Sequence, residues 1–407
     1  MATIIEQHPL YDILPIGQQV MFTVSNDTVV ANKFKVKFVA EIHVSDTAIN
    51  LSSATDRIGT FKTTPNNAGV GMFDLRNVLE TFVKSDNEPS SNAGYKGIKQ
   101  SITPFPLHLI DKFSLSENSI KYFAIQFKVE YADLASEDVG SPTDAVNSDQ
   151  YTMFNGVLQY DDVLEKSLFG NNYGYDLDEF YLNDSSAKFL SNSPTIQYAR
   201  LTDYGTLPFL NFLPASTDAV TTFQFKYYNS SDVLLDNENL QNQVSTGGAV
   251  ASGSTSNTRL NYLGAFPANL DGWSTKWDAN KANISWYTIQ VSGSDSSLYR
   301  INILCSEEKN YEGIRLTWLN QWGAWDYYTF NMKSTRSIET NRTAYTQLGG
   351  TWNESTFRIA DYKGGKKSFR VNSKEKIILN TDFVSEAEGS WFEELVNSPE
   401  VYIVNES

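Results

Sequence analysis

The sequence has a single cysteine in 407 residues, so no intramolecular disulfide can form. That residue, Cys305, alternates with Ile301 and Ile303, which predicts a small core residue rather than a reactive thiol. Histidine is equally scarce, with three residues, and none has metal-ligand spacing to another histidine or to the cysteine. We therefore expect neither a metal centre nor a bound cofactor.

Catalytic motifs are also missing. The sequence holds no serine-hydrolase elbow, no CxxC and no phosphate-binding glycine loop, so we expect no enzyme. Carboxylates are the only plentiful reactive groups, and the most specific functions they could serve are a glycosidase active site or a calcium site. A solvated surface is the favoured interpretation of the two densest clusters, which comprise Asp161, Asp162, Glu165, Asp176, Asp178 and Glu179.

The chain has fewer basic than acidic residues. The 32 basic residues face 48 acidic ones, and the formal charge is −16. A chain this acidic should repel nucleic acid and anionic membranes. It has no apolar run of the roughly 20 residues that a membrane span needs, and its N-terminus lacks the basic start of a secretion signal. We expect no specific nucleic-acid binding and no membrane insertion.

The composition of the chain favours β-strands. Hydrophobic residues make up 41% of the chain and aromatic residues 13%. "KFKVKFVAEIHV" and "KYFAIQFKVEY" alternate apolar and polar residues, which is typical of half-buried strands. Many short strands separated by turn residues predict a mainly β chain with two or more β-sandwich-like domains and a few short helices.

Four segments follow from the changes in composition. Residues 1–135 are predicted to form a sandwich-like domain with one short helix, and residues 136–150 an acidic linker or loop. Residues 151–335 are predicted to form a central sandwich with variable loops. Residues 336–407 are predicted to hold a β-hairpin, a short helix and a terminal strand.

Two local patterns organise the last segment. "STFRIADYKGGKKSFRVN" predicts a hairpin that turns at Lys-Gly-Gly-Lys. Ser390 followed by Glu393 predicts a capping box at the start of the helix, with Trp391 on its buried side.

Two stretches are candidates for contact with a partner. "IRLTWLNQWGAWDYYTF" holds three tryptophans, and its second strand is aromatic on both faces, which favours a core or a subunit interface over a sugar-binding platform. "YKGGKKSFR" is the one basic stretch, and it suits contact with an acidic neighbouring copy, although a solvated hairpin tip is the simpler interpretation. The candidate interface residues are Trp322, Trp325, Tyr327, Lys363, Lys366, Lys367 and Arg370.

Several stretches resemble structural proteins of tailed bacteriophages, including crAss-like phages and other phages of Bacteroidota. They are "GVGMFDLRNVLETFV", "YTMFNGVLQYDD", "GIRLTWLNQWGAWDYYTF" and "LNTDFVSEAEGSWFEELVNSPEVYIV". The resemblance covers most of the chain and is weakest over residues 165–300.

This resemblance implies a virion component, assembled in the host cytoplasm, in a tail or neck ring, an adaptor or a tail tip. Its expected partners are copies of itself and other virion proteins, such as portal, neck, tail or fibre components. A carbohydrate- or receptor-binding module of a phage tail is the alternative.

Overall fold

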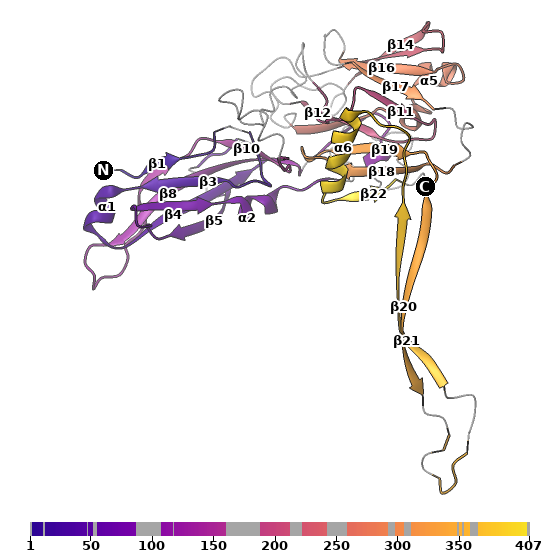
Figure 1. Ribbon diagram of the computed structural model, residues 1–407. Helices are drawn as coiled ribbons and strands as arrows, with labels where there is room; N and C mark the ends of the chain where they lie inside the picture. Colours follow the sequence, from indigo (N-terminus) through magenta and orange to yellow (C-terminus); the bar gives the residue numbers. More distant parts are fainter. Residues whose placement is uncertain are drawn as a thin grey trace. The chain divides into compact units, whose positions relative to one another are not determined.

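The computed structural model describes residues 2–10, 13–46, 48–51, 55–86, 107–116, 118–159, 188–211, 222–241, 259–291, 298–304, 311–347, 350–351, 354–358 and 365–404. Strands account for 48% of the structure and helices for 13%, which confirms the prediction of a mainly β chain with a few short helices. The chain divides into two units (Figure 1). The first comprises residues 1–305, 315–328 and 385–407, and the second comprises residues 306–314 and 329–384.

The N-terminal part of the first unit is a β-sandwich of two sheets (Figure 1). One sheet has three strands in the order β1 (Ile4–Gln7), β3 (Met21–Ser25), β6 (Val70–Asp74). The other has the order β2 (Ile13–Pro15), β10 (Tyr151–Phe154), β8 (Ile120–Ala132), β4 (Phe34–Ser45), β5 (Arg57–Thr63), with β9 (Thr143–Asn147) also paired to β8.

The core of this sandwich lies where the alternation of β4 and β8 places it. Ala40 pairs with Phe127 across the two strands, and both side chains are fully buried. The opposite sheet approaches so closely that a Cβ on Gly71 would lie 2.5 Å from the ring of Phe38. A glycine at this position therefore lets the two sheets pack together.

Two expectations about this region need correction. The segment predicted as an acidic linker contains β9, whose side chains are mostly exposed on both faces, so the sequence has no apolar alternation to reveal the strand. The alternation in "KFKVKFVAEIHV" predicts His43 among the polar residues of its strand, but its side chain is only 2% exposed. Its burial lowers the pKa of the imidazole, because the charged form loses its hydration.

A second sandwich occupies the middle of the first unit. Its larger sheet has the order β11 (Ile196–Ala199), β17 (Tyr299–Ile303), β16 (Trp286–Val291), β13 (Thr222–Tyr228), β14 (Leu234–Gln241). Its smaller sheet has the order β12 (Thr206–Asn211), β15 (Arg259–Gly264), β7 (Phe113–Leu115). The core between them is rich in aromatic rings; Phe209 and Phe223 meet edge to face with centroids 4.9 Å apart.

A third sheet, in the order β19 (Trp325–Phe330), β18 (Ile314–Leu319), β22 (Val401–Ile403), is formed by the aromatic hairpin and the last strand. The turn of this hairpin is tightly enclosed. Gly323 has φ 75°, and a Cβ there would lie 2.1 Å from the backbone oxygen of Asn155. A side chain at residue 323 is thus excluded both by backbone conformation and by space.

Helices are short throughout. They are α1 (Asp27–Asn32), α2 (Arg76–Leu79), η1 (Glu80–Phe82), η2 (Leu107–Leu109), α4 (Pro267–Leu270), α5 (Thr275–Asn280) and α6 (Glu386–Asn397). The capping box of α6 is formed by Ser385 and Glu388, so the prediction of Ser390 and Glu393 was wrong by five residues. Trp391 is buried, as predicted, but in the middle of the helix, with its ring 4.9 Å from that of Trp318.

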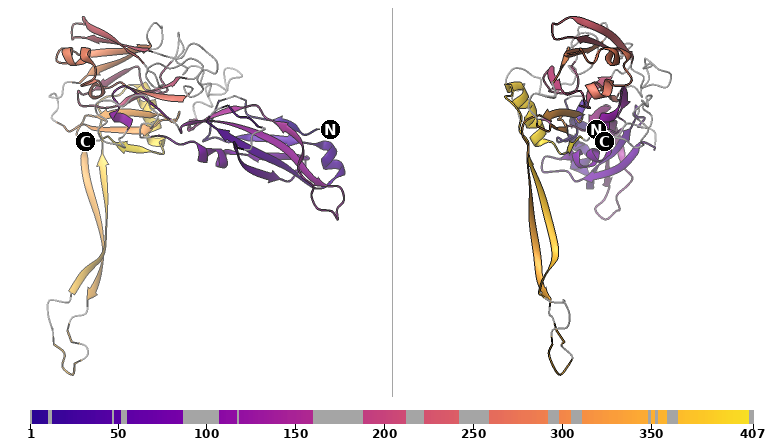
Figure 2. Two further views of the ribbon diagram at one scale, coloured as in Figure 1. Left: turned by 180° about the vertical axis from the view of Figure 1, so that it is seen from behind. Right: turned by 90° about the vertical axis from the view of Figure 1, so that its right-hand side faces the viewer.

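The second unit is dominated by a two-stranded ribbon of β20 (Thr335–Gln347) and β21 (Gly365–Ile378), seen from two sides in Figure 2. The antiparallel register runs from Thr335 opposite Ile378 to Gln347 opposite Gly365. The predicted hairpin correctly included the start of β21 but gave it the wrong partner. The strand that pairs with β21 is β20, which lies before residue 348, and not the predicted segment "STFRIADY".

Candidate functional site: an extended basic ribbon

Two kinds of feature are absent from the described part of the chain. Within it, no group of three or more histidine, cysteine or acidic side chains is arranged to bind a metal ion. None of its helices is long and apolar enough to cross a membrane. Cys305 and the carboxylate clusters of residues 161–165 and 176–179 lie outside the described residues.

One buried ion pair joins β18 to the second sandwich. The Arg315 guanidinium is 3.7 Å from the Asp203 carboxylate, and its Nε donates to the Tyr204 backbone oxygen over 2.6 Å. Burial opposes ionisation of Asp203, but the charges of Arg315 and Arg200 outweigh it and lower the pKa of this carboxyl group. The guanidinium also lies 4.5 Å from the ring centroid of Phe266. The Arg315 and Asp203 side chains are 3% and 1% exposed, so this pair links elements of the fold.

A second buried carboxylate, Asp326, lies on β19. Its Oδ2 accepts a hydrogen bond of 2.7 Å from Nε1 of Trp391. Burial raises the pKa of Asp326 to about 6, although hydrogen bonds from Trp391, Ser191 and Asn320 act in the opposite direction. The side chain is 4% exposed, so it ties α6 to the sheet instead of facing a substrate.

Asp326 should make stability fall as pH rises. Its pKa of about 6 in the folded state exceeds the roughly 3.9 of an unfolded chain, so between these values the unfolded state loses its proton first. The folded state should lose roughly 2–3 kcal/mol from this group between pH 4 and pH 6, and no more above that range. Asp326→Asn cannot titrate. In chemical denaturation from pH 4 to pH 7, the unfolding free energy of wild type minus that of the variant should fall by this amount, and a constant difference would contradict the assignment.

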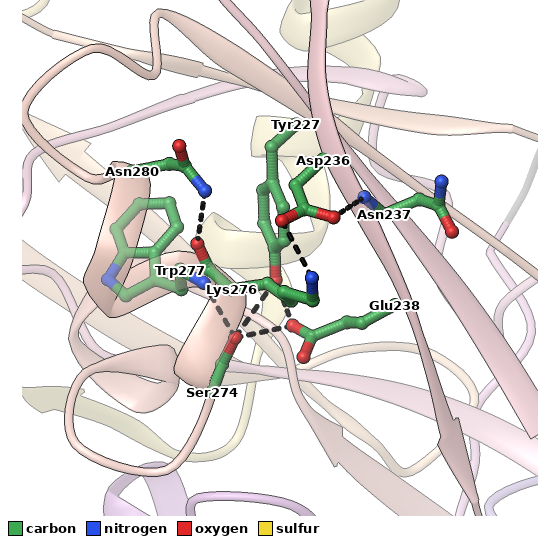
Figure 3. A network of polar contacts seen from close by, with 8 residues as sticks. All are labelled: Tyr227, Asp236, Asn237, Glu238, Ser274, Lys276, Trp277 and Asn280. Carbon is green, nitrogen blue, oxygen red and sulfur yellow. Dashed lines mark hydrogen bonds and ion pairs between the residues drawn. The ribbon is translucent and has the colours of Figure 1, made fainter.

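A third polar network caps α5 (Figure 3). Ser274 Oγ accepts a 2.9 Å hydrogen bond from the Trp277 backbone and donates to Glu238, which also accepts from Tyr227. Burial, together with the neighbouring Glu238 carboxylate, raises the pKa of Tyr227 well above its ordinary value. The network contains a neutral tyrosine and the N-cap of α5, so its role is structural.

The aromatic candidates are inside the first unit. Trp322 is 5% exposed, Trp325 2% and Tyr327 4%. Their burial follows from the position of the turn, where Asn320 donates to the Leu190 backbone oxygen over 2.9 Å. These rings therefore leave no free face for a neighbouring subunit, and the sugar-platform hypothesis loses the exposed tryptophan on which it depended.

The ribbon, in contrast, is exposed along both strands. Every residue of β20 and β21 is exposed except Gln347 and Ile377, which are half-buried. It carries two acidic side chains, Glu339 and Glu375, and none of its basic residues forms an ion pair with a described carboxylate. The basic residues are Arg336, Arg342, Lys366, Lys367, Arg370, Lys374 and Lys376. In a chain with a formal charge of −16, the ribbon is a local concentration of positive charge.

The two faces of the ribbon differ. Paired residues share a face, and residues alternate between faces along each strand. One face, which we call the polar face, carries Ser337, Glu339, Asn341, Arg370, Asn372, Lys374 and Lys376. The other, which we call the apolar face, carries Ile338, Ala344, Val371 and Ile377, together with the charged residues Arg336, Arg342 and Glu375; Phe369 lies at the register shift, opposite no residue of β20. Phe369 is 79% exposed and Ile338 69%. These large apolar side chains are exposed, and no described residue of the chain buries them.

A ribbon of two strands is only weakly stabilised by its own contacts. An isolated two-stranded hairpin is marginally stable in water, because it buries little apolar surface. Its outer edges also leave backbone groups unpaired, since among the described strands β20 and β21 pair only with each other. Contact with another molecule would supply both the missing burial and a reason for the exposed apolar face.

Three of the basic candidates lie on this ribbon. Lys366, Lys367 and Arg370 are exposed residues of β21, and their role in an interface stays a prediction, whereas Lys363 lies outside the described residues. Arg336 and Arg342 on β20 were missed. The sequence feature that could have indicated their strand is a run of thirteen residues without glycine or proline and rich in threonine. This run is too polar to show the apolar–polar alternation of a half-buried strand.

Comparison with known proteins adds no assignment. A scan against protein-family models and a search of curated proteins each found no match.

Proposed function

We propose that this chain is a non-enzymatic structural component of a tailed bacteriophage virion, most consistent with a tail or neck ring, an adaptor or a tail-tip protein. In this role, copies of the chain assemble into a symmetric oligomer that also contacts other virion proteins. Assembly takes place in the host cytoplasm, and the mature protein resides in the virion.

The observation that carries the proposal is the exposed ribbon of β20 and β21. A 13-residue strand paired with a 14-residue strand, with Phe369 79% exposed, is what an assembly arm offers to a neighbour. The polar networks around Asp203, Asp326 and Glu238 are enclosed within the fold, so they favour a structural role over catalysis. The motif resemblance to phage structural proteins supplies the kind of assembly.

Quantitative mass spectrometry of density-purified phage particles tests this proposal. The chain should be present in a fixed ratio to the major capsid protein, at several copies per particle, and should survive washing at high salt. Its presence in infected cells together with absence from purified particles would overturn the proposal.

A further inference from the structure

We infer that the ribbon of one copy docks on the outer face of α6 in a second copy of this chain. The inference rests on the proposed structural function and names the contact through which that function is exercised.

The apolar face indicates a protein partner. Ile338 and Val371 are 69% and 54% exposed and share one face of the ribbon, and Phe369, at the register shift of β21, is 79% exposed. The phosphate backbones of nucleic acids are bound by cationic and polar groups. A row of aliphatic and aromatic side chains would add nothing to such binding. A protein surface gains from burying such a row, at roughly 25 cal/mol per Å² of apolar area.

Charge indicates that this partner is another copy, and that the contact is not ribbon to ribbon. Two ribbons with seven basic and two acidic side chains each would repel. The rest of the chain is more acidic than its total of −16, because the ribbon contributes positive charge to that total. A basic ribbon that docks on an acidic surface elsewhere on the same type of chain makes a head-to-tail contact, the kind that forms a ring when the rotation between copies closes.

The outer face of α6 is the acidic surface that fits best. From residue 379 to residue 404 the chain has no basic side chain, and Glu386 and Glu393 are exposed on the helix. The last turn of α6 contains no basic residue, so the negative end of the helix dipole has no cation near it in the helix. Val396, in that turn, is 83% exposed and offers an apolar contact beside the carboxylates.

Charge reversal on the full-length chain tests the inference, with association measured by sedimentation velocity at about 0.1 M salt. Lys366→Glu with Lys367→Glu should weaken association at least about tenfold, and Glu386→Lys with Glu393→Lys should do the same. The four changes combined restore opposite charges and the formal charge of the chain, so association should return to within about threefold of wild type. Circular dichroism melting should show each variant folded; Glu386→Gln with Glu393→Gln is the milder substitute if the lysine variant does not fold.

Lys37→Glu with Lys226→Glu is the matched control, because it makes the same change of charge on strands of the first unit. It should associate like wild type. Unchanged association of the ribbon variant, no recovery in the combined variant, or ribbon-dependent binding of duplex DNA would each overturn the inference. A wild-type chain that stays monomeric in solution yet is abundant in purified particles would overturn the inference and leave the proposed function standing.

Discussion

Replacing Arg315 with methionine is expected to lower the free energy of unfolding by about 3–5 kcal/mol. The side chain is 3% exposed and is the partner of Asp203, itself 1% exposed. Methionine fills much of the same volume but removes one cationic partner of Asp203; Arg200 remains, with its guanidinium 2.8 Å away and half-buried. The cost comes mainly from a buried carboxylate that has lost a cationic partner, because burial opposes its ionisation.

Chemical denaturation with Asp203→Asn combined with Arg315→Met separates this cause from loss of packing. The double variant should recover a large part of the stability, since it contains no buried charge at this site. Arg200→Met is the matched control and should cost less, because its side chain is 24% exposed. Equal losses for Arg315→Met alone and for the double variant would show that packing against Phe266, rather than charge, determines the effect.

Replacing Trp391 with alanine should cost about 3–5 kcal/mol, the range of large aromatic truncations in cores. The ring is 2% exposed and packs 4.9 Å from Trp318, centroid to centroid. The substitution also removes the N–H that donates to Asp326, so a cavity and a less well satisfied carboxyl group arise together. We expect α6 to detach before the two sandwiches unfold.

Thermal and urea denaturation measure this effect. Phe383→Ala is the control, because Phe383 is fully exposed and its removal should change stability by less than about 0.5 kcal/mol. Trp391→Phe should fall between the two, since it keeps an aromatic ring but loses the hydrogen bond. A loss below about 1 kcal/mol for Trp391→Ala would contradict the view that this ring anchors the helix.

The strands of the N-terminal sandwich could be predicted from the sequence because apolar and polar residues alternate over part of each strand. Ala40 and Ile42 flank the polar Glu41, and they face Phe127 and Ile125 of β8, which flank Gln126. Local chemistry and tertiary packing agree in these strands, so composition and periodicity were sufficient.

The ribbon and the start of α6 could not be predicted, for two physical reasons. β20 has few apolar side chains, so its pairing with β21 is specified by partners far away in the sequence rather than by a local pattern. For α6, Ser385–Glu388 and Ser390–Glu393 both fit a capping box. The choice between them depends on where Trp391 can reach Trp318, which is a matter of tertiary structure.

The central claim of this account is that the ribbon is an assembly element. Amide hydrogen exchange, followed by mass spectrometry on the dissociated and the assembled chain, tests it most directly. We predict fast exchange in Thr335–Gln347 and Gly365–Ile378 of the dissociated chain, because a lone two-stranded ribbon opens readily. In the assembled chain these peptides should be protected by at least about tenfold, while peptides of β4 and β8 should not change. Equal exchange of the ribbon in both states would contradict the claim.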